Sequence, residues 1–188
     1  IYQRQDELNK GQYESRFESV VKLHNFYGIE YADFAAETAK LSLWIVEYQM
    51  NRQFKEIFGD APPTLPLNTG GTIYHGNALR INWEDICPPS KEFETYIAGN
   101  PPFKGGKVQS AEQKEDVRLI FAPIADKYKT LDYVACWYFL AAKYCKKNGS
   151  SCALVATNSI CQGEQVSMLW PSIFGLGVNI FFAHTSFK

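Results

Sequence analysis

A short loop near the middle of the chain carries groups that can activate a weak nitrogen nucleophile. The loop, Asn100-Pro101-Pro102-Phe103, follows an apolar segment and combines a side-chain amide, a rigid backbone and an aromatic ring. An aromatic amine such as the exocyclic amino group of adenine is a poor nucleophile, because its lone pair is delocalised into the ring. The side-chain oxygen of Asn100 and the carbonyl oxygen of Pro101 can each accept a hydrogen bond from that amine and favour a tetrahedral nitrogen. Proline fixes the loop geometry, and Phe103 can stack on a base or face a cationic methyl group.

Other polar side chains stand at the carboxyl ends of predicted strands. Glu30 ends one strand, Asn77 follows a second, Asn100 a third, and Thr157-Asn158-Ser159 a fourth. In an open parallel sheet, ligands bind beyond the carboxyl ends of the strands, so these side chains are expected to line one crevice. Taken alone, Glu30 or Asn77 is more simply interpreted as a turn residue. The four strands are expected at residues 25–30, 72–75, 95–98 and 152–156.

A long helix is expected after the first of these strands. Asp33 is a candidate N-cap for it, because its side chain can accept hydrogen bonds from the first turn. The helical spacing of the residues that follow predicts one face directed inward. That face comprises Phe34, Thr38, Leu41, Ile45 and Tyr48.

Two capping boxes predict the starts of later helices. Ser110 with Gln113 opens one helix, and Ser159 with Gln162 opens another near Trp170. The remaining expected elements are helices over 110–125 and 131–146 and a last strand over 178–183.

Strands and helices therefore alternate along the chain. This order favours an α/β fold in three layers, with helices on both faces of a mostly parallel sheet. The polar stretch 1–24 is compatible with a helical segment, and residues 25–188 are expected to form the sheet-bearing core of a single domain.

Composition and charge exclude several other classes of protein. The chain has 188 residues, 46% of them hydrophobic, which suits one globular domain, and it has no apolar run long enough to cross a membrane. Because the net charge is -1, any surface that binds nucleic acid must be local or lie outside the chain. The five cysteines include no Cys-x-x-Cys pair, and His24, His75 and His184 lack ligand spacing, so no metal site is expected. We interpret the chain, which begins at Ile1, as an excised segment of a soluble cytoplasmic protein.

The motifs together resemble those of amino-group DNA methyltransferases of the adenine-N6 type, whose hallmark is Asn/Asp-Pro-Pro-Tyr/Phe. The resemblance implies a Rossmann-like methyltransferase sheet with S-adenosylmethionine as the cofactor. Gly28-Ile29-Glu30 resembles the acidic motif that binds the ribose hydroxyls of this cofactor, and Tyr31 would lie near its adenine ring. Gly76-Asn77-Ala78-Leu79 resembles the next motif, whose usual aspartate binds the adenine amino group. Here that residue is Asn77, whose amide oxygen can still accept the hydrogen bond.

Further segments resemble the large bacterial type II restriction-modification enzymes. In that subgroup one polypeptide can carry nuclease, methyltransferase and target-recognition regions, and the implied partner is double-stranded DNA with a flipped adenine. Phe187 matches an aromatic position that holds the flipped base, although a core residue at a strand edge is an equally good interpretation. Lys104 and Lys107 are candidates for phosphate contacts, although solvated loop lysines are common. The segments that carry this resemblance are 131–137, 156–165 and 182–188.

One element of the family pattern is missing from the sequence. The chain contains no Asp/Asn-Pro-x-x-Gly-x-Gly loop, which in this family follows the first strand and lets backbone approach the methionine part of the cofactor. The order of motifs places that loop and its central strand upstream of Ile1. We therefore expect an incomplete sheet and no appreciable activity from the isolated chain.

Two other functions remain open at the level of sequence. A methyltransferase acting on a protein glutamine or on RNA faces the same problem of a planar nitrogen and is compatible with Asn-Pro-Pro-aromatic. A non-catalytic binding module with the same fold is the alternative from a different class. Asn100 favours adenine over cytosine, because cytosine-N4 enzymes more often carry serine there; this preference comes from the resemblance alone.

Overall fold

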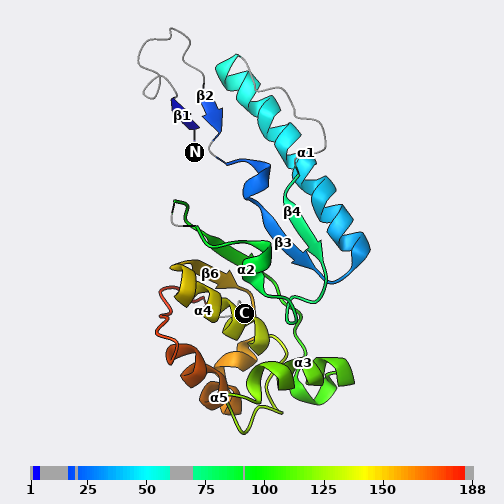
Figure 1. Ribbon diagram of the computed structural model, residues 1–188, viewed down its shortest axis with the longest axis vertical. Helices are drawn as coiled ribbons and strands as arrows, with labels where there is room; N and C mark the ends of the chain where they lie inside the picture. Colours follow the sequence, from blue (N-terminus) through cyan, green and yellow to red (C-terminus); the bar gives the residue numbers. More distant parts are fainter. Residues whose placement is uncertain (1, 5–16, 20, 60–69, 91, 185–188) are drawn as a thin grey trace. The chain divides into compact units, whose positions relative to one another are not determined.

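The computed structural model describes residues 2–4, 17–19, 21–59, 70–90 and 92–184 (Figure 1). The chain divides into two compact units, Ile1–Ile81 and Asn82–Lys188. The prediction from the sequence was one partial domain over residues 1–188, with 1–24 as its N-terminal segment. Each unit is described by itself below.

The first unit is built around one βαβ motif. Strands β3 (Tyr27–Glu30) and β4 (Thr72–His75) pair in parallel, with Glu30 opposite His75 at their carboxyl ends. Helix α1 (Asp33–Phe58) lies between them in sequence and alongside both strands in Figure 1. Two parallel strands need such a crossover connection, because the chain must return to the starting end of the first strand before the second strand begins. The predicted strand at 72–75 and the helix after β3 are confirmed.

Helix α1 packs through a different face from the one predicted. The expected inward residues are exposed, whereas the covered face carries Ala35, Ala36, Ala39, Leu43, Trp44 and Phe54. The start of β4 approaches this face so closely that a Cβ on Gly71 would lie 2.6 Å from Cδ1 of Leu43. Apolar residues occur on more than one side of α1, and the small alanines admit the closest approach, so periodicity alone selected the wrong side. Asp33 also lies inside the first turn, because the N-cap position is Ala32.

Part of the N-terminal stretch is extended instead of helical. Strands β1 (Tyr2–Arg4) and β2 (Phe17–Ser19) pair antiparallel, so the helical prediction for 1–24 is wrong for these residues. A short 3₁₀ helix, Leu23–Asn25, follows. Polar residues in this stretch are compatible with a helix, but propensity is a weak preference that strand pairing overrides.

The second unit repeats the parallel arrangement. Strands β5 (Tyr96–Gly99) and β6 (Ser151–Leu154) pair in parallel, with Gly99 opposite Leu154. Helices α3 (Ala111–Phe121) and α4 (Ala135–Asn148) lie between them in sequence. Parallel strands in both units confirm the α/β class predicted from the sequence.

Helices α3, α4 and α5 (Gly163–Phe174) enclose the core of this unit. The rings of Phe121 and Phe139 lie 5.4 Å apart between α3 and α4, and those of Tyr138 and Trp170 lie 6.1 Å apart between α4 and α5. The capping box of Ser110 and Gln113 is formed as predicted. The completely buried residues of this core are Phe121, Leu131, Val134, Ala135, Cys136 and Leu169.

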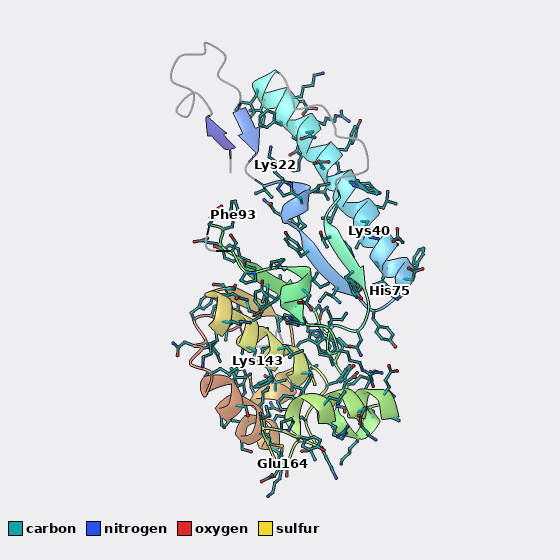
Figure 2. The ribbon with its side chains drawn as sticks, viewed as in Figure 1. Lys22, Lys40, His75, Phe93, Lys143 and Glu164 are labelled. Carbon is teal, nitrogen blue, oxygen red and sulfur yellow. The ribbon has the colours of Figure 1, made fainter. Side chains whose placement is uncertain are left out.

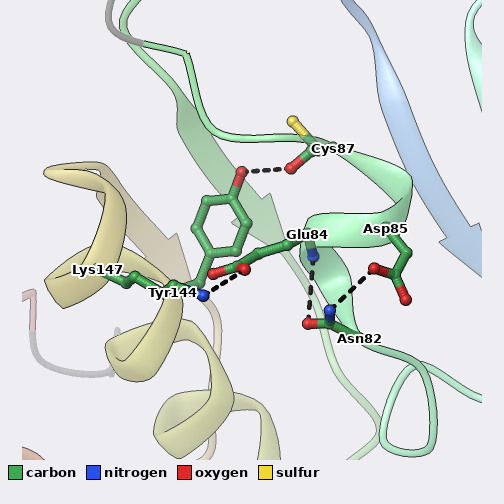
Figure 3. Close-up of polar contacts among 6 residues, drawn as sticks. All are labelled: Asn82, Glu84, Asp85, Cys87, Tyr144 and Lys147. Carbon is green, nitrogen blue, oxygen red and sulfur yellow. Dashed lines mark hydrogen bonds and ion pairs between the residues drawn. The ribbon is translucent and has the colours of Figure 1, made fainter.

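Short helix α2 (Trp83–Ile86) was not predicted, and α4 holds it in place (Figure 3). The Tyr144 hydroxyl donates a hydrogen bond to the Cys87 carbonyl oxygen over 2.8 Å, and Nζ of Lys147 lies 2.5 Å from Oε2 of Glu84. Asn82 caps the helix by accepting from the backbone N–H of Glu84. Four helical residues are too few to show a period, so only these contacts define the element.

Two further sequence expectations are wrong in the second unit. Residues 178–183 form no strand, because none of the strands that the structure describes is hydrogen-bonded to this segment, and Phe181 is 79% exposed there. Ser159 and Gln162 form no capping box: Ser159 lies in a 3₁₀ turn, and Gln162 precedes α5 without a side-chain cap. Within the described parts of the chain, no helix is long and apolar enough to span a bilayer.

Candidate active site

The loop Asn100-Pro101-Pro102-Phe103 starts at the carboxyl end of β5. Gly99, the last residue of β5, accepts a hydrogen bond at its carbonyl oxygen from the backbone N–H of Val155 over 3.0 Å. Asn100 and the turn that follows β6 therefore leave the sheet at the same edge. The structure thus brings together two of the four polar strand ends singled out in the sequence.

One residue of this loop is buried, and the other three are exposed to solvent. Pro101 is buried, whereas Asn100 and Pro102 are exposed and Phe103 is 42% exposed. An amide and an aromatic ring are therefore accessible to a substrate from a backbone that proline restrains.

The far end of the loop is held at the carbonyl oxygen of Lys104. This oxygen accepts a hydrogen bond from the backbone N–H of Tyr133 over 2.8 Å and another from Nε2 of Gln109 over 3.1 Å. Nε2 of Gln109 also donates to the carbonyl oxygen of Leu131 over 2.8 Å, so both amide protons are used. Gln109 is 6% exposed, and sequence reasoning did not identify its role.

The first turn of α5 supports the segment that holds Lys104. Oε1 of Gln165 accepts from the backbone N–H of Asp132 over 3.0 Å, and Nε2 of Gln165 donates to the carbonyl oxygen of Thr130 over 2.7 Å. The hydroxyl of Thr130 donates to Oε2 of Glu164, labelled in Figure 2, over 3.3 Å. The hydroxyl of Ser159 donates to Oδ2 of Asp132 over 2.5 Å.

A buried polar pair lies behind this segment. The Tyr133 hydroxyl donates to Oδ2 of Asp116 over 2.7 Å, and Asp116 is 1% exposed. Burial raises the pKa of the Tyr133 phenol, and the hydrogen bond to Asp116 raises that pKa further. Burial also raises the pKa of the Cys136 thiol, so this cysteine stays protonated and is a core residue.

In the first unit, Glu30 and Asn77 lie at one edge of the β3–β4 sheet. Glu30 is paired with His75, which Figure 2 labels, and its carbonyl oxygen accepts from the backbone N–H of Gly76 over 2.8 Å. Glu30 and Tyr31 are exposed, Tyr31 to 65%. A carboxylate and an aromatic ring are thus both open at this edge, which fits a nucleoside whose ribose offers hydroxyl donors.

Asn77 forms a turn with its own side chain. Its Oδ1 accepts from the backbone N–H of Leu79 over 2.9 Å, and its carbonyl oxygen accepts from the backbone N–H of Arg80 over 2.9 Å. Asn77 and Ala78 are half-buried, which fits a group that lines a binding surface.

The predicted site residues form two groups in the described part of the chain, and one further predicted residue lies outside it. Glu30, Tyr31, Asn77 and Ala78 belong to the first unit, and the loop with Lys104 belongs to the second. Phe187 lies outside the described residues. Among the residues that the structure describes, no group of three or more His, Cys, Asp or Glu side chains is arranged to hold a metal ion.

Comparison with known proteins gives a consistent result in sequence and in structure. The sequence model of the family described as the DNA-methyltransferase domain of MmeI matches residues 1–188. DNA methyltransferase A of Bacillus subtilis (strain 168) is 47% identical over 169 residues, which cover 89% of this chain.

A solved structure, the type IIL restriction-modification enzyme MmeI in complex with DNA, matches 84% of this chain with a TM-score of 0.76 and 40% identity. This match agrees with an incomplete Rossmann-like α/β fold. The chain spans 19% of the Bacillus protein and 21% of the MmeI chain, about a fifth of each.

Proposed function

The chain belongs to the family of MmeI DNA-methyltransferase domains, and we propose that it is part of a catalytic domain that methylates adenine N6 in DNA. The observation that carries this proposal is the Asn-Pro-Pro-Phe loop, anchored at both ends and exposed at Asn100 and Phe103. S-adenosylmethionine, when bound, supplies an electrophilic methyl group.

The loop residues act on the attacking nitrogen. Oδ1 of Asn100 and the carbonyl oxygen of Pro101 each accept a hydrogen bond from one N–H of the adenine amino group. These bonds localise the lone pair of the nitrogen and direct it at the methyl group. The backbone that carries both acceptors is restrained by two prolines, so little backbone entropy is lost on binding. The ring of Phe103 stacks on the base.

Four residues of the first unit suit the adenosyl part of the cofactor. The exposed carboxylate of Glu30 accepts hydrogen bonds from the ribose hydroxyls, and the ring of Tyr31 lies against the adenine. The amide of Asn77, beside Ala78, is assigned to the adenine amino group. Carboxylate and amide oxygens are acceptors for the hydrogen bonds that ribose hydroxyls and an adenine amino group donate.

Access to adenine N6 requires that the base leave the duplex. Unstacking costs a few kcal/mol, and contacts with Phe103 and Phe187 offset it. Lys104 is placed directly after the loop and is exposed, which suits a contact with a nearby phosphate. In a longer polypeptide, nuclease and target-recognition regions would act with this domain in a bacterial cytoplasm.

A panel of substrates tests the proposal against its alternatives. The full-length protein is incubated with S-adenosylmethionine carrying a tritiated methyl group and with duplex DNA, structured RNA or a glutamine-bearing protein. Transfer to DNA is the expected result. Transfer to RNA or protein alone would replace DNA as the substrate, and no transfer to any of the three would favour a non-catalytic binding module.

The isolated chain of 188 residues is proposed to be inactive. It carries the adenosyl-binding residues but no glycine-rich loop for the methionine part of the cofactor. Titration calorimetry of S-adenosylmethionine is expected to show binding by a longer chain that includes such a loop and not by this chain. Equal binding by both would refute the role assigned to the loop.

A further inference from the structure

We propose that Asp132 and Ser159 are positioning residues for methyl transfer, because their hydrogen bond fixes the two anchors of the Asn-Pro-Pro-Phe loop relative to each other. This inference rests on the proposed function and adds residues outside the loop to its machinery. Neither side chain belongs to the loop that receives the base.

The first anchor is the β5–β6 pair. The loop starts one residue after Gly99, which is paired with Leu154, and the bond from Val155 to the Gly99 carbonyl oxygen is the last link of that ladder. The same β6 strand leads within a few residues to the turn that carries Ser159. The start of the loop and Ser159 are therefore tied to one strand pair.

The second anchor is the segment from Leu131 to Tyr133. The Lys104 carbonyl oxygen, one residue after Phe103, accepts from the Tyr133 backbone N–H, and Gln109 clamps Lys104 to Leu131. Asp132 lies between the two residues that make these bonds. Its backbone N–H is engaged by Gln165, so its own position is fixed from α5 as well.

The Ser159–Asp132 hydrogen bond joins the two anchors. It spans 2.5 Å, and the hydroxyl of Thr157 lies 2.6 Å from that of Ser159 on the other side. With this bond the loop, β5, β6 and the Leu131–Tyr133 segment form a closed frame. Ser159 takes this partner instead of capping α5, and neither it nor Asp132 is buried in the core. The bond therefore links the anchors without being needed for core packing.

Loss of the Ser159–Asp132 hydrogen bond should lower the rate of methyl transfer more than it changes the affinity for substrate. The acceptors of Asn100 and Pro101 must meet the attacking nitrogen in one geometry, and small displacements are costly in rate. The proposed adenosyl-binding residues Glu30 and Asn77 belong to the other unit of the chain and are not part of the frame. An effect confined to kcat is therefore the signature of positioning.

The test uses single-turnover methylation of duplex DNA by the full-length protein. We expect Asp132→Ala and Ser159→Ala each to lower the rate by about 10- to 100-fold, with dissociation constants for DNA and S-adenosylmethionine within about twofold of the parent values. Asp132→Asn should restore most of the rate, because its Oδ1 still accepts from the Ser159 hydroxyl. The double alanine variant should be no slower than the slower single variant, since each single variant already removes the Ser159–Asp132 hydrogen bond.

Ser167→Ala is the matched control, because its hydroxyl makes only a local bond to the Glu164 carbonyl oxygen, 3.0 Å away. It should keep the parent rate. Parent rates in both single alanine variants would overturn the positioning proposal while leaving the proposed function intact. So would additive losses in the double variant, or an Asp132→Asn rate as low as that of Asp132→Ala. Failure of the parent protein to methylate DNA would instead refute the proposed function.

Discussion

Asn100 has an exposed amide on a backbone whose neighbours on both sides are fixed. Gly99 is held by the strand pair, and Pro101 is buried. Of the groups in the loop, only the Asn100 amide is a side-chain acceptor. Its contribution to the reaction is therefore separable by substitution from that of the backbone.

Asn100→Ala is predicted to lower the single-turnover rate of methyl transfer by roughly 10²- to 10³-fold, the usual cost of losing one preorganised polar contact in the transition state. Asn100→Asp should lose less, because a carboxylate oxygen still accepts a hydrogen bond. DNA binding, followed by fluorescence anisotropy, should change little in both. A rate for Asn100→Ala within about threefold of the parent would contradict the assigned role.

The buried Asp116 carboxylate depends in part on Tyr133. Tyr133→Phe removes the hydroxyl that donates to Asp116 and is predicted to lower the free energy of unfolding by about 1–3 kcal/mol, since a buried acceptor loses a donor. Urea unfolding followed by tryptophan fluorescence measures this change. Tyr128→Phe, at a half-exposed position, is the control and should stay within about 0.5 kcal/mol of the parent. Equal stability of both variants would show that the pair contributes nothing.

Single residues were predicted from the sequence where a local pattern existed. The loop at Asn100 was identified because residue type, rigidity and position after a strand coincide. Gln109 and Asp132 were missed, because their partners lie far along the chain: Gln109 bonds to Leu131, and Ser159 reaches Asp132 across 27 positions. No local spacing encodes such pairs, and the sequence pattern assigned Ser159 to a helix cap instead.

At the scale of elements, the loop after Phe103 lies directly on the segment before Asp132. A Cβ on Gly106 would meet the carbonyl oxygen of Thr130 at 3.0 Å, whereas a Cβ on Gly105 would meet no atom closer than 3.6 Å. The two neighbouring glycines therefore provide a matched pair of substitutions.

Gly106→Ala is predicted to destabilise the protein by about 1–3 kcal/mol and to slow methyl transfer, because the contact is with backbone that cannot rotate away. Gly105→Ala should leave both quantities close to those of the parent. Thermal unfolding and single-turnover assays on the two variants check this. Identical behaviour of the two alanine variants would show that the loop does not lie against Thr130.

Helix α2 provides a comparison between a hydrogen bond and a surface ion pair (Figure 3). Tyr144→Phe is predicted to cost about 1 kcal/mol, because Tyr144 is 5% exposed and its hydroxyl satisfies the Cys87 carbonyl oxygen. Lys147→Ala should cost less than about 0.5 kcal/mol, because solvent screens an ion pair whose lysine is 67% exposed. Chemical denaturation of both variants measures the difference. A larger loss for Lys147→Ala would reverse the assigned order.

Helices and strands were predicted well where the hydrophobic periodicity agreed with the capping and helix-breaking residues. Strand β4 and the capping box of α3 both match the prediction. The packing face of α1 was wrong, because a helix that is apolar on several sides does not specify which side meets the sheet. The strand expected at 178–183 failed because extended, apolar residues become a strand only where a neighbour offers backbone partners.

At the scale of the whole molecule, the sequence predicted the α/β class and the parallel pairing within each unit. It predicted a single sheet with all four polar strand ends in one crevice, and the two described units bring those ends together in pairs: Glu30 with Asn77, and Asn100 with the turn at 157–159. Alternation of strands and helices specifies parallel neighbours. It does not specify the long-range contacts that assemble them.

The chemical identity of the methylated nucleoside tests the central claim most directly. The full-length protein is incubated with duplex DNA and S-adenosylmethionine carrying a deuterated methyl group, and the digested nucleosides are identified by mass spectrometry. We predict deuterated N6-methyladenine with the parent protein and almost none with Asn100→Ala. Label in N4-methylcytosine, no label in DNA, or parental levels of N6-methyladenine in Asn100→Ala would contradict the claim.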